Sequence, residues 1–116
     1  MKAALLPALM LALVAAADDP LARRTAGPPQ PCIDPNLASS PQITDQGTII
    51  YRGTAKRLWV STPVGHCPML RPFTTLIIER FGSQLCRNDR FRVLEPGATI
   101  PSAACRFGEF VPWDKS

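Results

Sequence analysis

The chain has 116 residues, of which 46% are hydrophobic and 19% are charged, and its formal net charge at pH 7 is +4. This length holds one small domain and excludes a multidomain architecture, and a hydrophobic core of that size gives only marginal stability by itself. Four cysteines are present, so we expect covalent cross-links to supply part of the missing stability.

The first residues have the pattern of a secretory signal peptide, which we assign to residues 1–17. Lys2 supplies a positive charge, the stretch Ala3–Val14 is almost wholly apolar, and the small residues Ala15–Ala17 suit a signal peptidase. The apolar run is shorter than the roughly 20 residues that span a bilayer. We therefore expect cleavage after Ala17, a periplasmic or secreted location, and no transmembrane segment in the mature chain.

Residues 18–31 predict a flexible, proline-rich leader. Three prolines lie near its end and no apolar period is present, so the segment does not bury enough surface to offset the entropy of ordering. The folded domain is then expected to extend over residues 32–113, with a short tail at residues 114–116.

Short runs of β-branched and aromatic residues, separated by turns that contain glycine or proline, predict an all-β fold. The expected strands are a short one within residues 33–43, followed by 48–51, 57–61, 75–81, 90–94 and 104–111. Gly108, inside the last strand, indicates a bulge or a close approach of the backbone. Five or six such strands predict a small antiparallel barrel or sandwich that is stapled by disulfides.

Most of the aromatic side chains are expected to pack in the core or at its edge, as is usual in a small β domain. The predicted packing residues are Phe81, Phe91, Phe107 and Phe110.

The cysteines are expected to form disulfides rather than a metal site. No C-x-x-C motif and no pair with zinc-finger spacing occurs, and thiols oxidise in an exported protein, so we expect no metal and no other cofactor. Four cysteines allow three connectivities, and the sequence does not select among them. We favour Cys67–Cys86 together with Cys32–Cys105.

Recognisable short motifs surround the cysteines. After Cys32 and the segment 45–51, the chain carries C-P-x-L at Cys67–Leu70, L-C-x-x-D at Leu85–Asp89 and C-x-x-G-x-F at Cys105–Phe110. In this combination they resemble a family of small exported proteins of Gram-negative bacteria that is catalogued as a domain of unknown function. The resemblance covers Cys32 to about Pro112, with a departure at residues 56–61. It implies a periplasmic, disulfide-bearing β domain, and it supplies no catalytic or binding residues.

Candidate catalytic residues are few. His66 is the only histidine, and although it precedes Cys67, adjacent side chains of an extended segment point apart and an oxidised cysteine is inert. The nine carboxylates are scattered, and no nucleophile, phosphate-loop or dinucleotide motif occurs. The sequence therefore predicts a protein that is not an enzyme.

Arginines in the C-terminal half give the only indication of a ligand. Arg90 and Arg92 share one face by the two-residue period of a strand, and Arg106 joins them if its strand is the neighbour in register. Such a stripe would hold phosphate or carboxylate groups. The alternative is a solvated strand face that nearby carboxylates partly neutralise, namely Glu79, Asp89 and Glu109.

These features predict a non-enzymatic periplasmic binding or envelope-associated domain that uses a protein- or anion-binding surface. Its expected partner is an envelope protein or an anionic envelope polymer, and not a nucleic acid, because exported proteins do not meet one. A small secreted inhibitor that presents the loop 61–68 to an enzyme is the alternative. An exposed, rigid loop would favour the inhibitor, whereas a continuous arginine stripe with few carboxylates would favour anion binding.

Overall fold

The computed structural model describes residues 19–37, 40–79 and 82–116. The expected signal peptide therefore lies outside the described residues. The described part forms ten short strands in three sheets, and every strand pair is antiparallel. The predicted all-β antiparallel fold is confirmed, with strands that are shorter and more numerous than the five or six expected.

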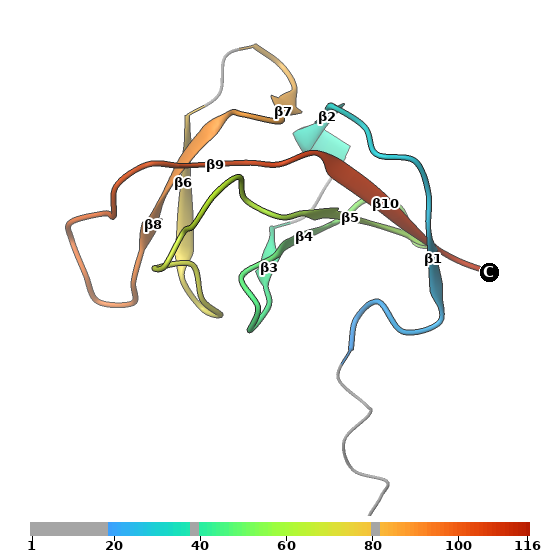
Figure 1. Cartoon of the computed structure of the whole chain (residues 1–116), viewed down its shortest axis with the longest axis horizontal. Helices are drawn as coiled ribbons and strands as arrows, with labels where there is room; N and C mark the ends of the chain where they lie inside the picture. The colour runs from blue at the N-terminus through green and yellow to red at the C-terminus, as the bar shows by residue number, and fades with distance from the viewer. Residues whose placement is uncertain (1–18, 38–39, 80–81) are drawn as a thin grey trace, which may run out of the picture.

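The largest sheet has five strands in the order β1-β10-β5-β4-β3 (Figure 1). Their bounds are β1 Arg24–Ala26, β10 Phe110–Lys115, β5 Arg57–Ser61, β4 Ile49–Arg52 and β3 Gln42–Ile43. β4 and β5 form a hairpin across the polar turn 53–56, and β5 has the predicted bounds.

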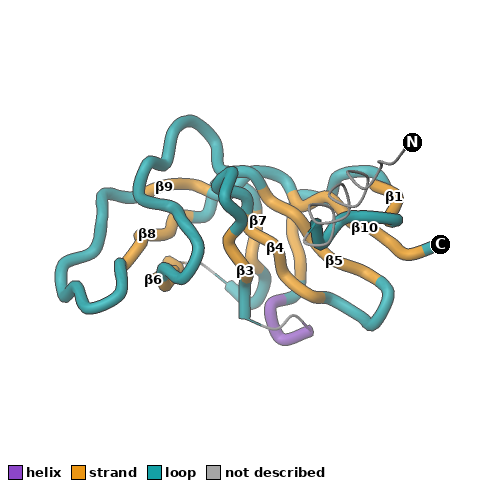
Figure 2. Tube along the Cα trace, turned by 90° about the horizontal axis from the view of Figure 1, so that it is seen from below, coloured by secondary structure: helices purple, strands orange, loops and turns teal. Residues whose placement is uncertain are grey.

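A three-stranded sheet and a two-stranded sheet complete the fold. The first has the order β6-β8-β9, with β6 Thr75–Glu79, β8 Arg90–Leu94 and β9 Cys105–Arg106, and the second pairs β2 Cys32–Ile33 with β7 Leu85–Cys86. A 3-10 turn, Pro35–Leu37, follows β2. Figure 2 shows the three-stranded sheet at one end of the molecule and β1 with β10 at the other.

The main core lies between the sheets and receives side chains from all three of them. Its buried members are Ile33, Ile43, Ile49, Tyr51, Leu70, Leu85, Phe91, Val93, Phe107 and Phe110. Three of the predicted aromatic residues form its centre, because the Phe107 ring lies 4.7 Å from that of Phe91 and 5.7 Å from that of Phe110. The fourth, Phe81, lies outside the described residues. A smaller cluster of Ile50, Leu58 and Val60 packs on the other face of the five-stranded sheet.

The predicted single strand 104–111 is wrong, because the chain breaks there to change sheets. β9 belongs to the three-stranded sheet and β10 to the five-stranded sheet, and Figure 1 shows the two crossing the molecule in succession. Ser61 pairs with Phe110, and Val64 pairs with Arg106, so one strand advances three residues while the other advances four. The extra residue makes a bulge, which bends the strand.

Gly108 occupies this corner because the backbone of the opposing strand approaches it closely. A Cβ atom at position 108 would lie 2.1 Å from the carbonyl oxygen of Thr62. Ser61 fixes the same corner, since its Oγ donates a hydrogen bond to the Gly108 carbonyl at 3.0 Å. The predicted close backbone approach at this glycine is confirmed.

The predicted flexible leader and C-terminal tail are wrong where they meet the sheet. β1 pairs with β10 up to Lys115, and Gln30 exchanges two backbone hydrogen bonds with Phe110 at 2.8 and 2.9 Å. Proline removes a donor only at its own position, so the residues between the prolines still pair with the edge of β10. The ordered fold therefore starts before Cys32 and continues beyond residue 113.

The four cysteines form two disulfides, as predicted, but with a different pairing. The bonds are Cys32–Cys86 and Cys67–Cys105, in place of the favoured Cys67–Cys86 and Cys32–Cys105. Cys32 and Cys86 are directly opposite in the β2–β7 pair, and this register sets the first bond. Two disulfides are typical of proteins that fold in an oxidising, extracellular environment.

Within the described residues, no helix is both long enough and apolar enough to cross a membrane.

Candidate functional site

The outer face of the three-stranded sheet carries a row of four residues from four neighbouring segments. Glu79 pairs with Arg90, Arg90 pairs with Arg106, and Arg106 pairs with Val64 of the loop 61–68. Residues that are directly opposite in antiparallel strands project from the same face, so these four side chains form a line across the sheet. We call this line, Glu79, Arg90, Arg106 and Val64, the arginine row.

The opposite face of the same sheet belongs to the core, which gives the arginine row a rigid support. Phe91 and Val93 alternate with the arginines along β8 and are fully buried. The two-residue period therefore forces Arg90 and Arg92 outward whenever the phenylalanine packs inward.

Arg90 and Arg106, two of the three predicted anion-binding residues, are side by side and exposed. Four ion pairs join residues of the described chain, and neither arginine takes part in any of them. Opposed side chains on adjacent strands have Cβ atoms about 5 Å apart. Two guanidinium charges ~6 Å apart in water repel by about 0.7 kcal/mol, a cost that an anion bound between them would remove.

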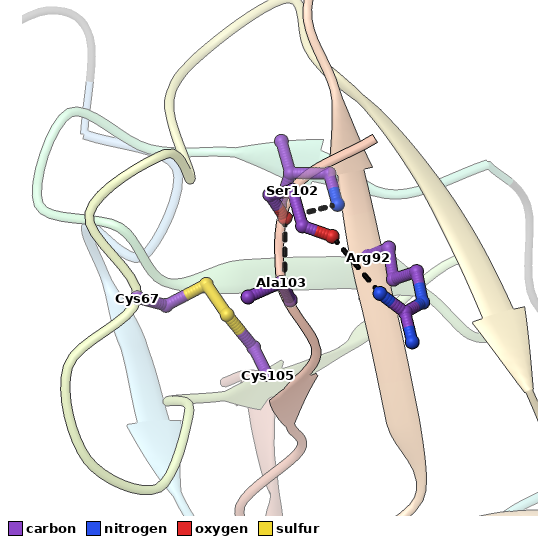
Figure 3. The surroundings of a disulfide bond; sticks show 6 residues. Cys67, Arg92, Ser102, Ala103 and Cys105 are labelled. Atoms are coloured by element: carbon purple, nitrogen blue, oxygen red, sulfur yellow. Dashed lines mark hydrogen bonds between the residues drawn. A yellow bond between two sulfur atoms is a disulfide. The ribbon is translucent and has the colours of Figure 1, made fainter. Parts of the chain in front are cut away.

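Arg92, the third predicted residue, is held by the fold and is only partly available. Its Nε lies 3.3 Å from the Glu79 carboxylate, and its Nη1 donates a hydrogen bond to the Ser102 carbonyl at 3.2 Å (Figure 3). Ser102 is itself fixed, because its Oγ accepts a hydrogen bond from the Val93 amide at 2.9 Å. Figure 3 shows Arg92 and the Cys67–Cys105 bond on opposite sides of the segment that carries Ser102.

The carboxylates that were expected to neutralise this face act mostly elsewhere. Asp89 accepts a hydrogen bond from the Cys86 amide at 2.8 Å, and Glu109 forms an ion pair with Arg87 at 2.9 Å. Glu79 alone of the three lies in the row, where it contacts Arg92. The centre of the row therefore keeps two positive charges that no carboxylate of the described chain contacts.

The loop 61–68 borders the row and is fastened at several points. The Val64 amide donates a hydrogen bond to the Arg106 carbonyl at 3.0 Å, and Cys67 is bonded to Cys105. Between these anchors, Gly65 has a φ of +76° with open space around its Cα, and Val64 and His66 are exposed. The loop is thus both exposed and restrained.

His66 lies on the exposed part of the loop 61–68. It lines a shallow pocket of about 320 Å³ together with Asp45 and Arg71. In the described part of the chain, no three His, Cys, Asp or Glu side chains come together in a way that could hold a metal ion.

Sequence reasoning missed two exposed apolar residues. Val64 joins the row through a single bridge to Arg106, and no local pattern predicts a pairing across more than forty residues. Phe73 is 91% exposed, although it belongs to a residue type that is usually packed. The signal for Phe73 was its position directly after Pro72, where turns are common.

Comparison of the chain with protein-family models, with curated proteins and with solved structures finds no match.

Proposed function

We propose that this protein is a non-enzymatic binding domain, exported to the periplasm, that holds phosphate or carboxylate groups of an anionic envelope polymer or an envelope protein. The observation that carries the proposal is the direct opposition of Arg90 and Arg106, both exposed and both without an ion pair in the described chain. Such opposition destabilises a sheet, so it is explained best by a ligand that needs it.

Guanidinium groups suit this ligand because their planar fork donates two parallel hydrogen bonds to a phosphate or a carboxylate. Arg90 and Arg106 sit on paired strands, so their backbone positions are fixed before binding and less entropy is lost. Val64 and Ile77, which are 51% and 40% exposed, flank the arginines and offer contacts for the apolar part of a ligand.

Export is supported by the apolar N-terminal segment, by the two disulfides and by the cysteine motifs, which resemble those of periplasmic proteins. Loss of Lys2 with the signal peptide leaves a formal charge of +3. The mature chain is therefore basic, which favours anionic partners.

The test compares the wild type with R90A/R106A on two anionic probes, immobilised heparin and vesicles that contain phosphatidylglycerol. At about 20 mM salt, where screening is weak, we expect the double variant to bind at least about tenfold more weakly. Wild-type binding should fall steeply as the salt concentration rises, because each bound phosphate contact is electrostatic.

The matched control is R52A/K56A, which removes the same formal charge from exposed positions at one end of the five-stranded sheet. It should weaken binding by no more than about twofold. Equal losses in the two double variants would mean that only net charge matters, and absence of wild-type binding at low salt would refute the proposal.

Inhibition of an enzyme by the loop 61–68 is a second candidate function. The observation in its favour is the exposed Val64–His66 segment, which is held between a backbone hydrogen bond and a disulfide. A loop that is fixed in its bound conformation binds tightly because little entropy is lost on association.

For this candidate, the purified protein is assayed against a panel of secreted proteases and lysozymes. We expect stoichiometric inhibition of one enzyme class and a loss of at least about tenfold in affinity for V64D. R52A/K56A serves again as the control. Inhibition that V64D leaves unchanged, or no inhibition at micromolar concentrations of protein, would exclude this candidate.

A further inference from the structure

A groove of the described chain lies away from the arginine row, beside the edge of β3 that no other described strand covers. Its volume is about 940 Å³, and its walls come from the β3 edge with the turn that follows it, from residues 72–74 and from residues 19–21. This volume lies within the range of about 300 to 1,000 Å³ that is usual for ligand-binding clefts.

The β3 edge presents backbone groups that are suited to a further strand. β3 is the last strand of its sheet, and Thr44 donates a backbone hydrogen bond to Thr48 at 3.0 Å. Bonded and non-bonded pairs alternate in an antiparallel ladder, so Gln42 with Ile50 is a bonded pair and Ile43 with Ile49 is not. The N–H and C=O groups of Ile43 therefore point away from β4, toward the groove.

The opposite wall presents an aromatic side chain that the fold does not need for packing. Phe73 is 91% exposed and has a φ of +70°. It is the third residue of a turn in which the Thr74 amide donates to the Arg71 carbonyl at 3.3 Å, a position that normally holds glycine or asparagine when φ is positive. A phenylalanine there gains no burial and strains the backbone, so its use is best explained by a partner.

The charge of the groove is opposite to that of the protein as a whole. Among its described lining residues, two are carboxylates, Asp19 and Asp45, and none is a lysine or an arginine. The full chain nevertheless has a formal charge of +4. Charge complementarity therefore selects a basic occupant for this groove.

We propose that the groove binds an extended peptide segment of a partner protein, in which apolar and basic residues alternate, as an added strand on β3. Backbone pairing with Ile43 would provide affinity, Phe73 would cover an apolar side chain, and Asp45 would attract a basic one. This site is separate from the arginine row, and it adjoins the pocket that Asp45 shares with His66 of the loop 61–68.

The experiment titrates the disulfide-intact protein into a fluorescein-labelled eight-residue peptide of alternating valine and lysine, at about 150 mM salt. The expected dissociation constant is about 100 μM or lower. A peptide with glutamate in place of lysine, and one with N-methylated valines, should each bind at least about tenfold more weakly, since they lack the charge and the backbone donors. Amide resonances of residues 42–46 and 72–74 should shift on binding.

Phe73→Gly is the decisive variant because it removes the side chain and relieves the positive φ at the same time. We expect its denaturation midpoint to stay the same or to rise, while peptide affinity falls about tenfold. The matched control is Ile100→Ser, which removes an 83% exposed apolar side chain outside the groove and should leave affinity unchanged. Asp45→Asn should weaken binding of the lysine peptide about threefold.

Three results would overturn the proposal. They are the absence of saturable binding up to about 1 mM peptide, equal affinity for the lysine and glutamate peptides, and wild-type affinity in Phe73→Gly. A dimer that Phe73→Gly dissociates would assign the groove to a second copy of this chain and would likewise overturn the peptide proposal.

Discussion

Arg57 and Asp114 form a bidentate ion pair that joins β5 to β10. The Arg57 Nε donates to Oδ1 of Asp114 at 2.7 Å and its Nη2 donates to Oδ2 at 2.8 Å, while the guanidinium carbon lies 5.2 Å from the centre of the Trp59 ring. These hydrogen bonds lower the pKa of Asp114 below its ordinary value of 3.8 and raise the pKa of Arg57. Arg90 and Arg106 have the same side chain but no such partner among the described residues, which is why they, and not Arg57, are the arginines that we propose for binding.

The lowered pKa of Asp114 makes part of the stability depend on pH. A carboxylate whose pKa is lower in the folded state stabilises the fold above its unfolded-state pKa, about 3.9, and this contribution is lost as the pH falls through the lowered folded-state pKa. We therefore expect Asp114→Asn to unfold at a lower urea concentration than wild type at pH 7. The difference should shrink below about pH 4, measured by urea titrations down to about pH 2.

Glu109→Gln provides the control for this prediction, because it removes an exposed ion pair held by one contact at 2.9 Å. Such pairs contribute little, so its urea midpoint at pH 7 should lie close to that of the wild type. A difference between wild type and Asp114→Asn that stays constant from neutral to acidic pH would contradict the assigned role of Asp114.

At the scale of the elements, local patterns predicted the strands that carry their own signal. β5 and β8 have the predicted bounds because β-branched and aromatic residues fill them and alternation marks their inner face. The two-residue strands β2, β7 and β9 are different, since each exists only through a partner that is distant in the sequence. The local pattern predicted one strand where β9 and β10 are separate; it indicated a bulge or close approach at Gly108 but not the change of sheet there.

The candidate site likewise contains residues that local patterns predicted and residues that they did not. The period of β8 was enough to place Arg90 and Arg92 on one face, and the condition stated for Arg106, a neighbouring strand in register, is met. Glu79 was named as a carboxylate that would neutralise this face, and it contacts Arg92, whereas the hydrogen bond from Arg92 to the Ser102 carbonyl was not predicted, because Ser102 belongs to another segment. For Phe73, Pro72 indicated a turn, but the exposure of the ring also depends on a positive φ that phenylalanine rarely adopts, and no local pattern predicts that φ.

At the scale of the whole molecule, the disulfides tie together segments that the sheets alone connect weakly. Cys32–Cys86 holds the two-residue pair β2–β7, and Cys67–Cys105 holds the loop 61–68 against β9. The favoured pairing failed because it treated Cys32 and Cys105 as the ends of the domain. The ends of the described fold are β1, which precedes Cys32 in the sequence, and β10, which follows Cys105, and these two strands pair with each other.

Both disulfides close long loops, so both are expected to contribute strongly to stability. Their sequence separations are 54 and 38 residues, for which the chain-entropy relation gives about 4 kcal/mol each before any strain in the folded state. We expect C32A/C86A and C67A/C105A each to lower the free energy of unfolding by about that amount, measured by urea titration at pH 7. This loss is a large share of the 5–15 kcal/mol typical of a domain, so either variant should melt well below the wild type.

The two variants should differ in which part of the molecule loses protection from hydrogen exchange. Without Cys67–Cys105 the loop 61–68 keeps only its backbone anchors, so the Val64 amide should exchange its hydrogen much faster than in the wild type. C32A/C86A retains the Cys67–Cys105 bond. When the two variants are compared at equal free energy of unfolding, C32A/C86A should therefore preserve the protection of the Val64 amide from exchange.

Mass mapping of the unreduced protein must also recover peptides linked as Cys32–Cys86 and Cys67–Cys105. Recovery of a Cys67–Cys86 link would contradict the register of β2 with β7, and with it the arrangement of the sheets around the core.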